Sequence, residues 1–298
     1  MKLGWIGIGK MGNPMATRLL EAGNEMYVCD VSKSSTDEIC AKGAKFIPTP
    51  AKLAEEVDII FSIIPNSKIL KAIVMGEDGL IETIKKDSIY IDMSTVDPVS
   101  SAEVNAAIEA KGAFHVRANV SGSVEFAREG TLSGLSSGPR AAYDKVLPLL
   151  NVLTAKQYYM GANDEARAMK IIINMLLGTS MLATAESLVM GEKLGLDWET
   201  MVDAIVDSAA ASPSAKFKRE MFKKRDFRPM STAGIMDKDM NFALDIAKDN
   251  QLNLPLAAMS RQFYCGMGST GMWDLDYAAT LLVLEEMNGV TDKESILE

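Results

Sequence analysis

Three glycines follow an apolar run near the start of the chain, in KLGWIGIGKMG. Gly7, Gly9 and Gly12 have the spacing of a turn whose backbone lies against the pyrophosphate of a dinucleotide, with a helix N-terminus facing its charge. The alternative is an ordinary turn with coincidental glycines. The context favours the first interpretation, and the residues of this turn that we expect to bind the cofactor are Gly7, Gly9, Lys10, Met11 and Gly12.

The next apolar run, EMYVCD, ends at Asp30, where a carboxylate can accept hydrogen bonds from both ribose hydroxyls of the cofactor. A carboxylate at this position repels the 2′-phosphate of NADP. The sequence therefore favours NAD over NADP, although Ser32 and Lys33 just beyond could weaken that preference.

Polar residues follow two further apolar runs, in IIPNS and DMSTVDP. In a doubly wound sheet the ligand lies outside the carboxyl ends of the strands. We therefore expect Pro65, Asn66, Ser94 and Thr95 to line the cofactor, against the alternative that they are plain loop residues.

The segment VSGSVEFAREGTLSGLSSG, residues 120–138, is interpreted as an unusual loop. Its small residues Ser121, Gly122 and Ser123 leave backbone N–H groups uncovered, and such a run can wrap an anion such as a carboxylate. A flexible turn is the alternative, and this segment alone favours it.

Lys170 and Asn174 are four residues apart, so they share one face of a predicted helix in AMKIIINMLL. A lysine buried in such a face must be paired or must have a lowered pKa, which makes it a candidate acid or base. The alternative is a lysine that extends to solvent. Lys238, followed by Asp239, is a weaker candidate that could equally begin a solvated helix.

The single histidine, His115, lies in the apolar stretch AFHVRANV, where a structural role is favoured. With one histidine there is no multi-histidine metal site, and we expect no metal. Three cysteines, Cys29, Cys40 and Cys265, show no metal-ligand spacing and leave one unpaired in any disulfide scheme. They are interpreted as reduced thiols of a cytoplasmic protein.

Composition narrows the class of partner. The 298 residues carry a net charge of −9, which disfavours nucleic acid and anionic membranes but leaves room for a small carboxylate substrate in a local positive pocket. The longest apolar run, residues 171–177, is far too short to cross a membrane, and we expect no membrane association.

These candidate residues need a scaffold, and the apolar pattern supplies it. Apolar strands alternate with helices through the first half, which predicts an α/β domain, a Rossmann-type, doubly wound and mainly parallel sheet, over residues 1–161. Long helical patterns then predict an all-α substrate and oligomerisation domain over residues 162–298. Its first helix could run for about 28 residues and join the two domains. Its length favours a homo-oligomer.

Five motifs in order resemble the β-hydroxyacid dehydrogenase family, which includes 3-hydroxyisobutyrate dehydrogenase, tartronate semialdehyde reductase and 2-(hydroxymethyl)glutarate dehydrogenase. The motifs span nearly the whole chain: GIGKMGNPMA, DMST, VSGS with GTL, a glycine nine residues before Lys170 with Asn174 four residues after it, and the Lys238–Asp239 pair. Each is weak alone, but their collinear order is specific.

The resemblance implies a function for most of these residues. Lys170 would be the catalytic lysine that exchanges a proton with the substrate oxygen, and Asn174 would hold the same oxygen or the substrate. Ser121, Gly122 and Ser123 would bind the substrate carboxylate, and Thr95 and Lys238 would contact the nicotinamide half of the cofactor. It also implies a Rossmann-type domain, an all-helical domain and a homodimer or homotetramer.

Departures from the family pattern leave the substrate open. Asn119 replaces a usual proline, Ser123 replaces a glycine, and Met230 and Ser231 stand where Gly-Phe is usual. We expect NAD-dependent hydride transfer on a small β-hydroxy acid or its semialdehyde. The alternatives are a different carbonyl or a β-hydroxy amino acid as substrate, or a non-catalytic NAD-binding scaffold.

Overall fold

A computed structural model describes residues 1–290. The chain divides into two compact units, Met1–Lys170 and Ile171–Glu298. The division falls inside one continuous helix, α8 (Glu165–Lys193), so this helix begins in the first unit and ends in the second. The boundary predicted from the sequence, after Gly161, coincides with the end of the last strand, β8.

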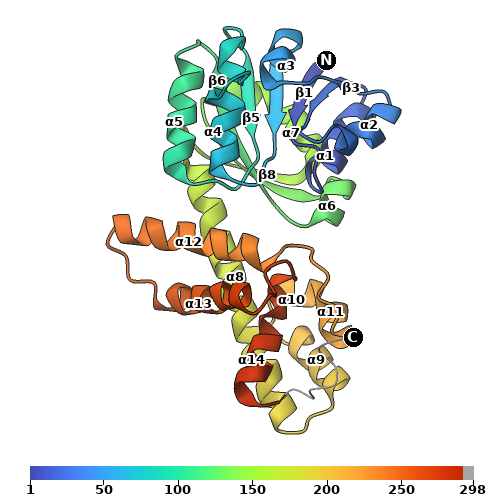
Figure 1. The fold of residues 1–298 in the computed structure, drawn as a ribbon, viewed down its shortest axis with the longest axis vertical. Helices are drawn as coiled ribbons and strands as arrows, with labels where there is room; N and C mark the ends of the chain where they lie inside the picture. Colours follow the sequence, from blue (N-terminus) through green and yellow to red (C-terminus); the bar gives the residue numbers. More distant parts are fainter. Residues whose placement is uncertain (291–298) are drawn as a thin grey trace. The chain divides into compact units, whose positions relative to one another are not determined.

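The first unit is built on one eight-stranded sheet with the order β3-β2-β1-β4-β5-β6-β7-β8. Figure 1 draws this sheet with helices packed against it. All neighbouring strands are parallel except β6 and β7, which are antiparallel, so the predicted mainly parallel, doubly wound sheet is confirmed. The strands are β1 (Lys2–Ile6), β2 (Glu25–Cys29), β3 (Lys45–Phe46), β4 (Ile59–Ser62), β5 (Ile89–Asp92), β6 (Phe114–Ser121), β7 (Leu132–Ser137) and β8 (Thr154–Gly161).

Helices cover both faces of this sheet, because successive strand residues point to opposite sides and both sets are apolar. Trp5 packs in the core under one set of helices, whereas its neighbour Ile6 packs in the core on the other face. The first set is α1 (Gly12–Glu21), α2 (Asp37–Ala41), α6 (Val124–Glu129) and α7 (Arg140–Leu153), and the second is α3 (Pro50–Glu56), α4 (Ser67–Met75) and α5 (Pro98–Glu109).

The structure corrects the interpretation of residues 120–138 as a loop. This segment holds the short helix α6 and the strand β7, which pairs with β6 on one side and β8 on the other. Serines and glycines such as Ser133 and Gly134 have low strand propensity. Pairing on both edges satisfies their backbone groups, so tertiary context overrides local propensity here.

The second unit is helical throughout its described part, as predicted. α8 has 29 residues, close to the expected length, and its buried side packs with the following helices around residues such as Met181, Leu188 and Tyr264. The other helices are α9 (Trp198–Asp207), α10 (Pro213–Phe217), α11 (Arg219–Lys224), α12 (Ala233–Asp249), α13 (Pro255–Ser269) and α14 (Thr280–Asn288).

By length and hydropathy, α8 is the one helix within residues 1–290 that could cross a membrane. One side of α8 is buried inside the protein. Arg167 in its first turn is fully buried and ion-paired with Asp92, and Met181 and Leu188 further along lie in the helical core.

Candidate active site

The glycine turn between β1 and α1 has a different physical requirement at each glycine. Gly7 has a φ of +90°, and a Cβ there would lie 2.3 Å from the Ile63 carbonyl oxygen. A Cβ on Gly12 would lie 1.9 Å from the Gly7 carbonyl oxygen, so this glycine lets α1 pack against the turn. Nothing lies within 4 Å of a Cβ built on Gly9. These are the three tasks of a dinucleotide turn: a tight bend, close packing of helix and strand, and an open approach for the pyrophosphate.

Asp30 lies at the end of β2 beside this turn. Its Oδ2 accepts a hydrogen bond of 2.7 Å from the Ile8 N–H, and its Oδ1 accepts one of 2.8 Å from the Ser32 N–H. The carboxylate therefore ties the glycine turn to the end of β2 and keeps further lone pairs for ribose hydroxyls. The preceding residue, Cys29, is buried, and burial raises the pKa of its thiol to about 12, which makes it an unreactive core residue.

The loops after β4 and β5 place the next candidates at the same carboxyl edge of the sheet. Asn66 caps α4, because its Oδ1 accepts the Ile69 N–H at 3.0 Å, while Pro65 before it is exposed. Thr95 is half-buried. Ser94 is buried instead, and its hydroxyl donates to Asp92 at 2.6 Å, so this residue shapes the loop that carries Thr95.

The Ser121–Gly122–Ser123 run links the end of β6 to α6. Gly122 has a φ of +139°, and a Cβ there would lie 2.7 Å from a methyl carbon of Leu132. Only glycine fits such a position. The hydroxyl oxygen of Ser123 is buried and has no hydrogen-bond partner in the described part of the protein.

The first turn of α8, which precedes Lys170 by one helical turn, is held by buried polar contacts within the first unit. Arg167, three residues before Lys170, donates from Nη2 to Asp92 at 2.5 Å and from Nη1 to the Ser94 carbonyl at 2.6 Å. Its Nε donates to Ser101 at 3.1 Å. One buried guanidinium thus joins α8 to β5, to the loop before Thr95 and to α5.

A second set of candidates comes together within the helical unit. Asn174 on α8 donates from Nδ2 to Asp239 on α12 at 2.6 Å, and both side chains are buried. The ammonium of Lys238 lies 2.9 Å from the other oxygen of Asp239. Asp239 therefore links the two predicted residues, Asn174 and Lys238.

Comparisons with known proteins match nearly the whole chain. The sequence profile of the NAD binding domain of 6-phosphogluconate dehydrogenase matches residues 2–161, and that of the NAD-binding region of NADP-dependent 3-hydroxyisobutyrate dehydrogenase matches residues 165–284. The chain is 34% identical to 2-(hydroxymethyl)glutarate dehydrogenase of Eubacterium barkeri over 98% of its own length and 97% of that protein. The chain belongs to the β-hydroxyacid dehydrogenase family.

Two further comparisons agree with this β-hydroxyacid dehydrogenase assignment. The chain is 31% identical to 2-hydroxy-3-oxopropionate reductase of Escherichia coli, covering 96% of this chain and 98% of that protein. The crystal structure of 3-hydroxyisobutyrate dehydrogenase from Salmonella typhimurium superimposes with a TM-score of 0.88 at 24% identity, over 95% of this chain and 99% of that one, which shows a common fold. The protein is therefore an NAD(P)-dependent oxidoreductase.

Residues to which the sequence interpretation gave no role hold the candidate residues of this dehydrogenase in place. Asp92, Arg167 and Asp239 are all buried and each contacts a candidate residue or its loop. Asp92 and Asp239 lie within quoted motifs, and Arg167 lies three residues before Lys170 at the start of a mainly apolar helix pattern. A charge in an apolar run requires a partner, which is the signal that points to such residues.

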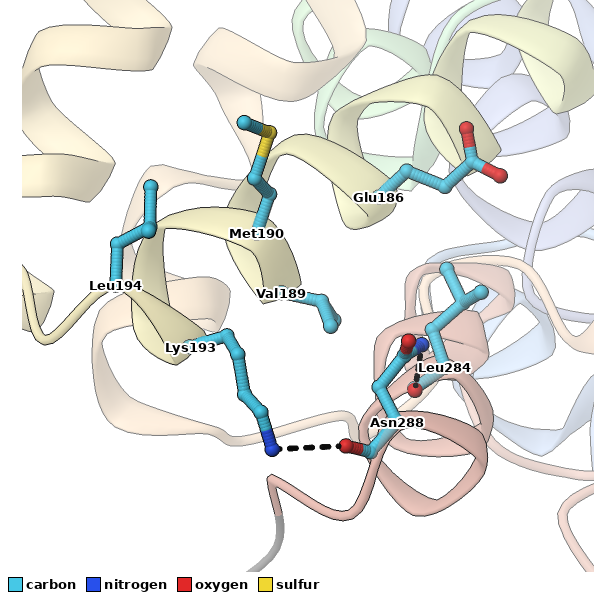
Figure 2. A pocket seen from close by; sticks show the side chains of 7 residues that line it. All are labelled: Glu186, Val189, Met190, Lys193, Leu194, Leu284 and Asn288. Carbon is cyan, nitrogen blue, oxygen red and sulfur yellow. Dashed lines mark hydrogen bonds between the residues drawn. The ribbon is translucent and has the colours of Figure 1, made fainter.

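Two of the hollows in the described part of this dehydrogenase can be compared with the candidate site. One, of about 600 Å³, lies along α1 and includes Ile8, Gly9 and Lys10 of the glycine turn. The other, of about 390 Å³, lies in the helical unit between the end of α8 and α14, where Lys193 donates to the Asn288 carbonyl (Figure 2). The second hollow contains none of the predicted site residues.

Proposed function

We propose that this protein transfers a hydride between a nicotinamide cofactor and a small β-hydroxy acid or its semialdehyde, with Lys170 as the general acid and base. The observation that carries the proposal is the anchoring of the first turn of α8. Arg167 bonds the carbonyl of Ser94, next to Thr95, and Lys170 lies one helical turn further on. This arrangement supports a lysine held beside the cofactor loop.

The proposed reaction divides the work among a few groups. When bound, the nicotinamide supplies or accepts the hydride. Lys170 gives a proton to the carbonyl oxygen during reduction and removes it from the alcohol during oxidation. Asn174 orients the same oxygen, and its bond to Asp239 supports this by fixing the amide. Thr95 and Lys238 contact the nicotinamide half of the cofactor.

The substrate carboxylate would bind at Ser121, Gly122 and Ser123. Two features support this: the positive φ of Gly122, which places the run in a glycine-dependent turn such as those that bind anions, and the Ser123 hydroxyl, which has no partner within the protein. The net charge of −9 makes a local anion site of this kind necessary for a carboxylate to bind.

We also propose NAD as the preferred form of the cofactor. Asp30 supports this because both carboxylate oxygens are fixed by backbone N–H groups at the end of β2, where its charge opposes a 2′-phosphate. Titration of NADH and NADPH by fluorescence tests it. Tighter NADPH binding than NADH binding would overturn the assignment.

The experiment for the reaction follows NADH absorbance with four substrates: 3-hydroxyisobutyrate, 2-hydroxy-3-oxopropionate, 2-(hydroxymethyl)glutarate and serine. Wild type should turn over at least one hydroxy acid, and Lys170→Ala should lose about 10²–10⁴-fold in kcat because it lacks the acid and base. Equal activity in Lys170→Ala would refute the mechanism. Tight NADH binding without turnover of any substrate would favour a non-catalytic scaffold.

A homodimer or homotetramer in the cytoplasm completes the proposal. It is supported by apolar side chains that α8 and the residues after it leave exposed, among them Leu176, Met190 and Leu194. Light scattering coupled to size-exclusion chromatography measures the oligomeric state, and a monomer at micromolar concentration would contradict it.

A further inference from the structure

Five buried or largely buried side chains form one continuous polar chain at the start of α8: Asp92, Arg167, Ser101, Asp164 and Arg117. Arg167 and Asp92 are each fully buried, and their ion pair is the centre of this chain. The group is called the α8 anchor below. It connects β5, α5, β6 and the N-terminus of α8, all within the first unit.

The contacts of the α8 anchor fix the helix from two sides. Ser101 receives the Arg167 Nε–H at 3.1 Å and donates to Asp164 at 2.5 Å. Arg117 donates to the same Asp164 oxygen at 3.0 Å, and the Asp164 carbonyl accepts the N–H of Ala168 at 3.1 Å. Asp164, just before α8, and Arg167, in its first turn, are therefore both held by buried polar side chains.

The same guanidinium also fixes the cofactor loop. The Ser94 carbonyl accepts Arg167 Nη1 at 2.6 Å and Asn119 Nδ2 at 2.6 Å, and the Ser94 hydroxyl donates to Asp92. The loop before Thr95 and the helical turn before Lys170 thus share one rigid set of bonds. Neither can shift without breaking a buried ion pair, which is strongly unfavourable.

We propose that Arg167, through its pair with Asp92, is a positioning residue that sets the Lys170 amine relative to the nicotinamide. The proposal rests on the proposed function of Lys170. Arg167 itself touches neither substrate nor cofactor in this account. It acts by holding the first turn of α8 to the loop of Ser94. The distance between the Lys170 amine and the nicotinamide ring is thereby fixed.

The physical reason for a large effect is geometric. Proton and hydride transfer need their groups within hydrogen-bond reach, and a misplacement of about 1 Å can cost about 10²-fold in rate. Arg167 has three different acceptors, and its planar guanidinium can satisfy all three at once. A lysine at this position reaches fewer of them and holds the turn less firmly.

Two variants test the proposal, because simple removal of Arg167 would leave Asp92 as a buried unpaired charge and could prevent folding. Arg167→Lys keeps the charge, and the double variant Asp92→Asn with Arg167→Gln removes both charges together. The double variant Arg225→Gln with Glu285→Gln in the helical unit is the matched control, since it likewise removes an arginine and its buried carboxylate together, outside the proposed site.

The first measurement needs no cofactor and no substrate. Hydrogen exchange of the amides at residues 168–170 should quicken by about 10²-fold in the double variant and by about tenfold in Arg167→Lys, while amides of residues 181–189 keep their protection. Unchanged exchange at residues 168–170 would overturn the anchoring. The control, Arg225→Gln with Glu285→Gln, should leave this turn as in wild type.

The second measurement separates positioning from folding. With NADH and the substrate that wild type turns over, kcat should fall by about 10²-fold in the double variant and about tenfold in Arg167→Lys, while the Kd for NADH changes by less than about threefold. The pH at half-maximal kcat should also move. A smaller folded fraction would instead lower kcat by the same factor at every pH.

The outcomes distinguish this proposal from the one on which it rests. Full kcat in both Arg167 variants, with Lys170→Ala inactive, would overturn the positioning role and leave the general acid and base in place. Full activity in Lys170→Ala would refute the general acid and base itself, and the positioning role with it.

Discussion

The glycine turn and the α8 anchor serve the same edge of one sheet, yet they are built by opposite means. The turn is made of backbone: Gly7, Gly9 and Gly12 lie within six consecutive residues, and their constraints come from main-chain atoms. The anchor is made of side chains from distant parts of the sequence. Arg167 and Asp92 are 75 residues apart, and Arg117 and Asp164 are 47 apart.

This difference teaches where precision comes from in such a site. A turn with a fixed backbone can present N–H groups to a pyrophosphate without help from the rest of the fold. A general acid on a long helix has no such local support, so its position depends on buried charge pairs. We therefore expect changes in the turn to act through sterics, and changes in the anchor to act through electrostatics and lost hydrogen bonds.

The largest effect should come from Gly12→Ala, which tests whether the turn is limited by backbone sterics. The new Cβ would lie 1.9 Å from the Gly7 carbonyl oxygen, a main-chain atom that cannot move aside. We expect the free energy of unfolding to fall by about 3 kcal/mol or more. Urea denaturation followed by circular dichroism measures it.

Gly9→Ala is the matched control, because the same methyl group meets nothing within 4 Å. Its free energy of unfolding should stay within about 0.5 kcal/mol of wild type. Its NADH affinity should fall by about tenfold, because the methyl group stands where the pyrophosphate approaches. If Gly9→Ala lowered the free energy of unfolding as much as Gly12→Ala, steric contact of the new Cβ would not explain the effect at Gly12.

The local nature of the turn explains why the sequence was sufficient to predict it. Gly7, Gly12 and Asp30 lie within one βαβ unit, and their spacing carries the requirement directly. The parallel sheet was predictable for a similar reason, since buried strands have continuous apolar runs. The strand β7 was missed because Ser133 and Gly134 have turn-like composition, and only pairing with β6 and β8 makes them a strand.

An intermediate effect should come from Ser101→Ala, which removes a link in the α8 anchor. The buried Ser101 hydroxyl joins Arg167 to Asp164, so its loss leaves both charged groups short of a partner. We expect a loss of about 1–3 kcal/mol in the free energy of unfolding. Urea denaturation measures this loss as well.

Ser88→Ala is the control for the loss of a buried hydroxyl, because the Ser88 oxygen is buried without a hydrogen-bond partner. It should be neutral or slightly stabilising. If both serine variants lost the same stability, the anchor would contribute no more than an isolated hydroxyl, and the contrast with the glycine turn would disappear.

The anchor also shows what the sequence could not provide. Each charged residue is visible in its apolar surroundings, as Arg167 is within ARAMKIII and Asp92 at the end of IYID. A single sequence gives no distance between such residues, so the need for a partner is predictable but the partner is not. Asp239 is a similar case, since its contact with Asn174 joins helices 65 residues apart.

The smallest effect at pH 7 concerns His115, which tests whether its buried position beside Arg117 and Arg167 keeps the imidazole neutral. Burial lowers the pKa of His115 well below its ordinary value, and the positive charges of Arg117 and Arg167 lower it further. The folded state therefore keeps a neutral imidazole while the unfolded chain binds a proton below about pH 6.5. Stability must then fall as pH falls below that value, by about 1.4 kcal/mol per pH unit from this residue.

His115→Phe removes this dependence and keeps the shape, because the ring stacks on Tyr90 at 5.2 Å and both imidazole nitrogens are buried without partners. In urea denaturation at pH 7, 6 and 5, the phenylalanine variant should gain on wild type as the pH falls, with unchanged turnover at pH 7. Parallel stability curves would mean that the fold accepts a protonated imidazole beside Arg117 and Arg167. The positive charges of Arg117 and Arg167 would then be neutralised by Asp164 and Asp92, and they would not act on the His115 ring.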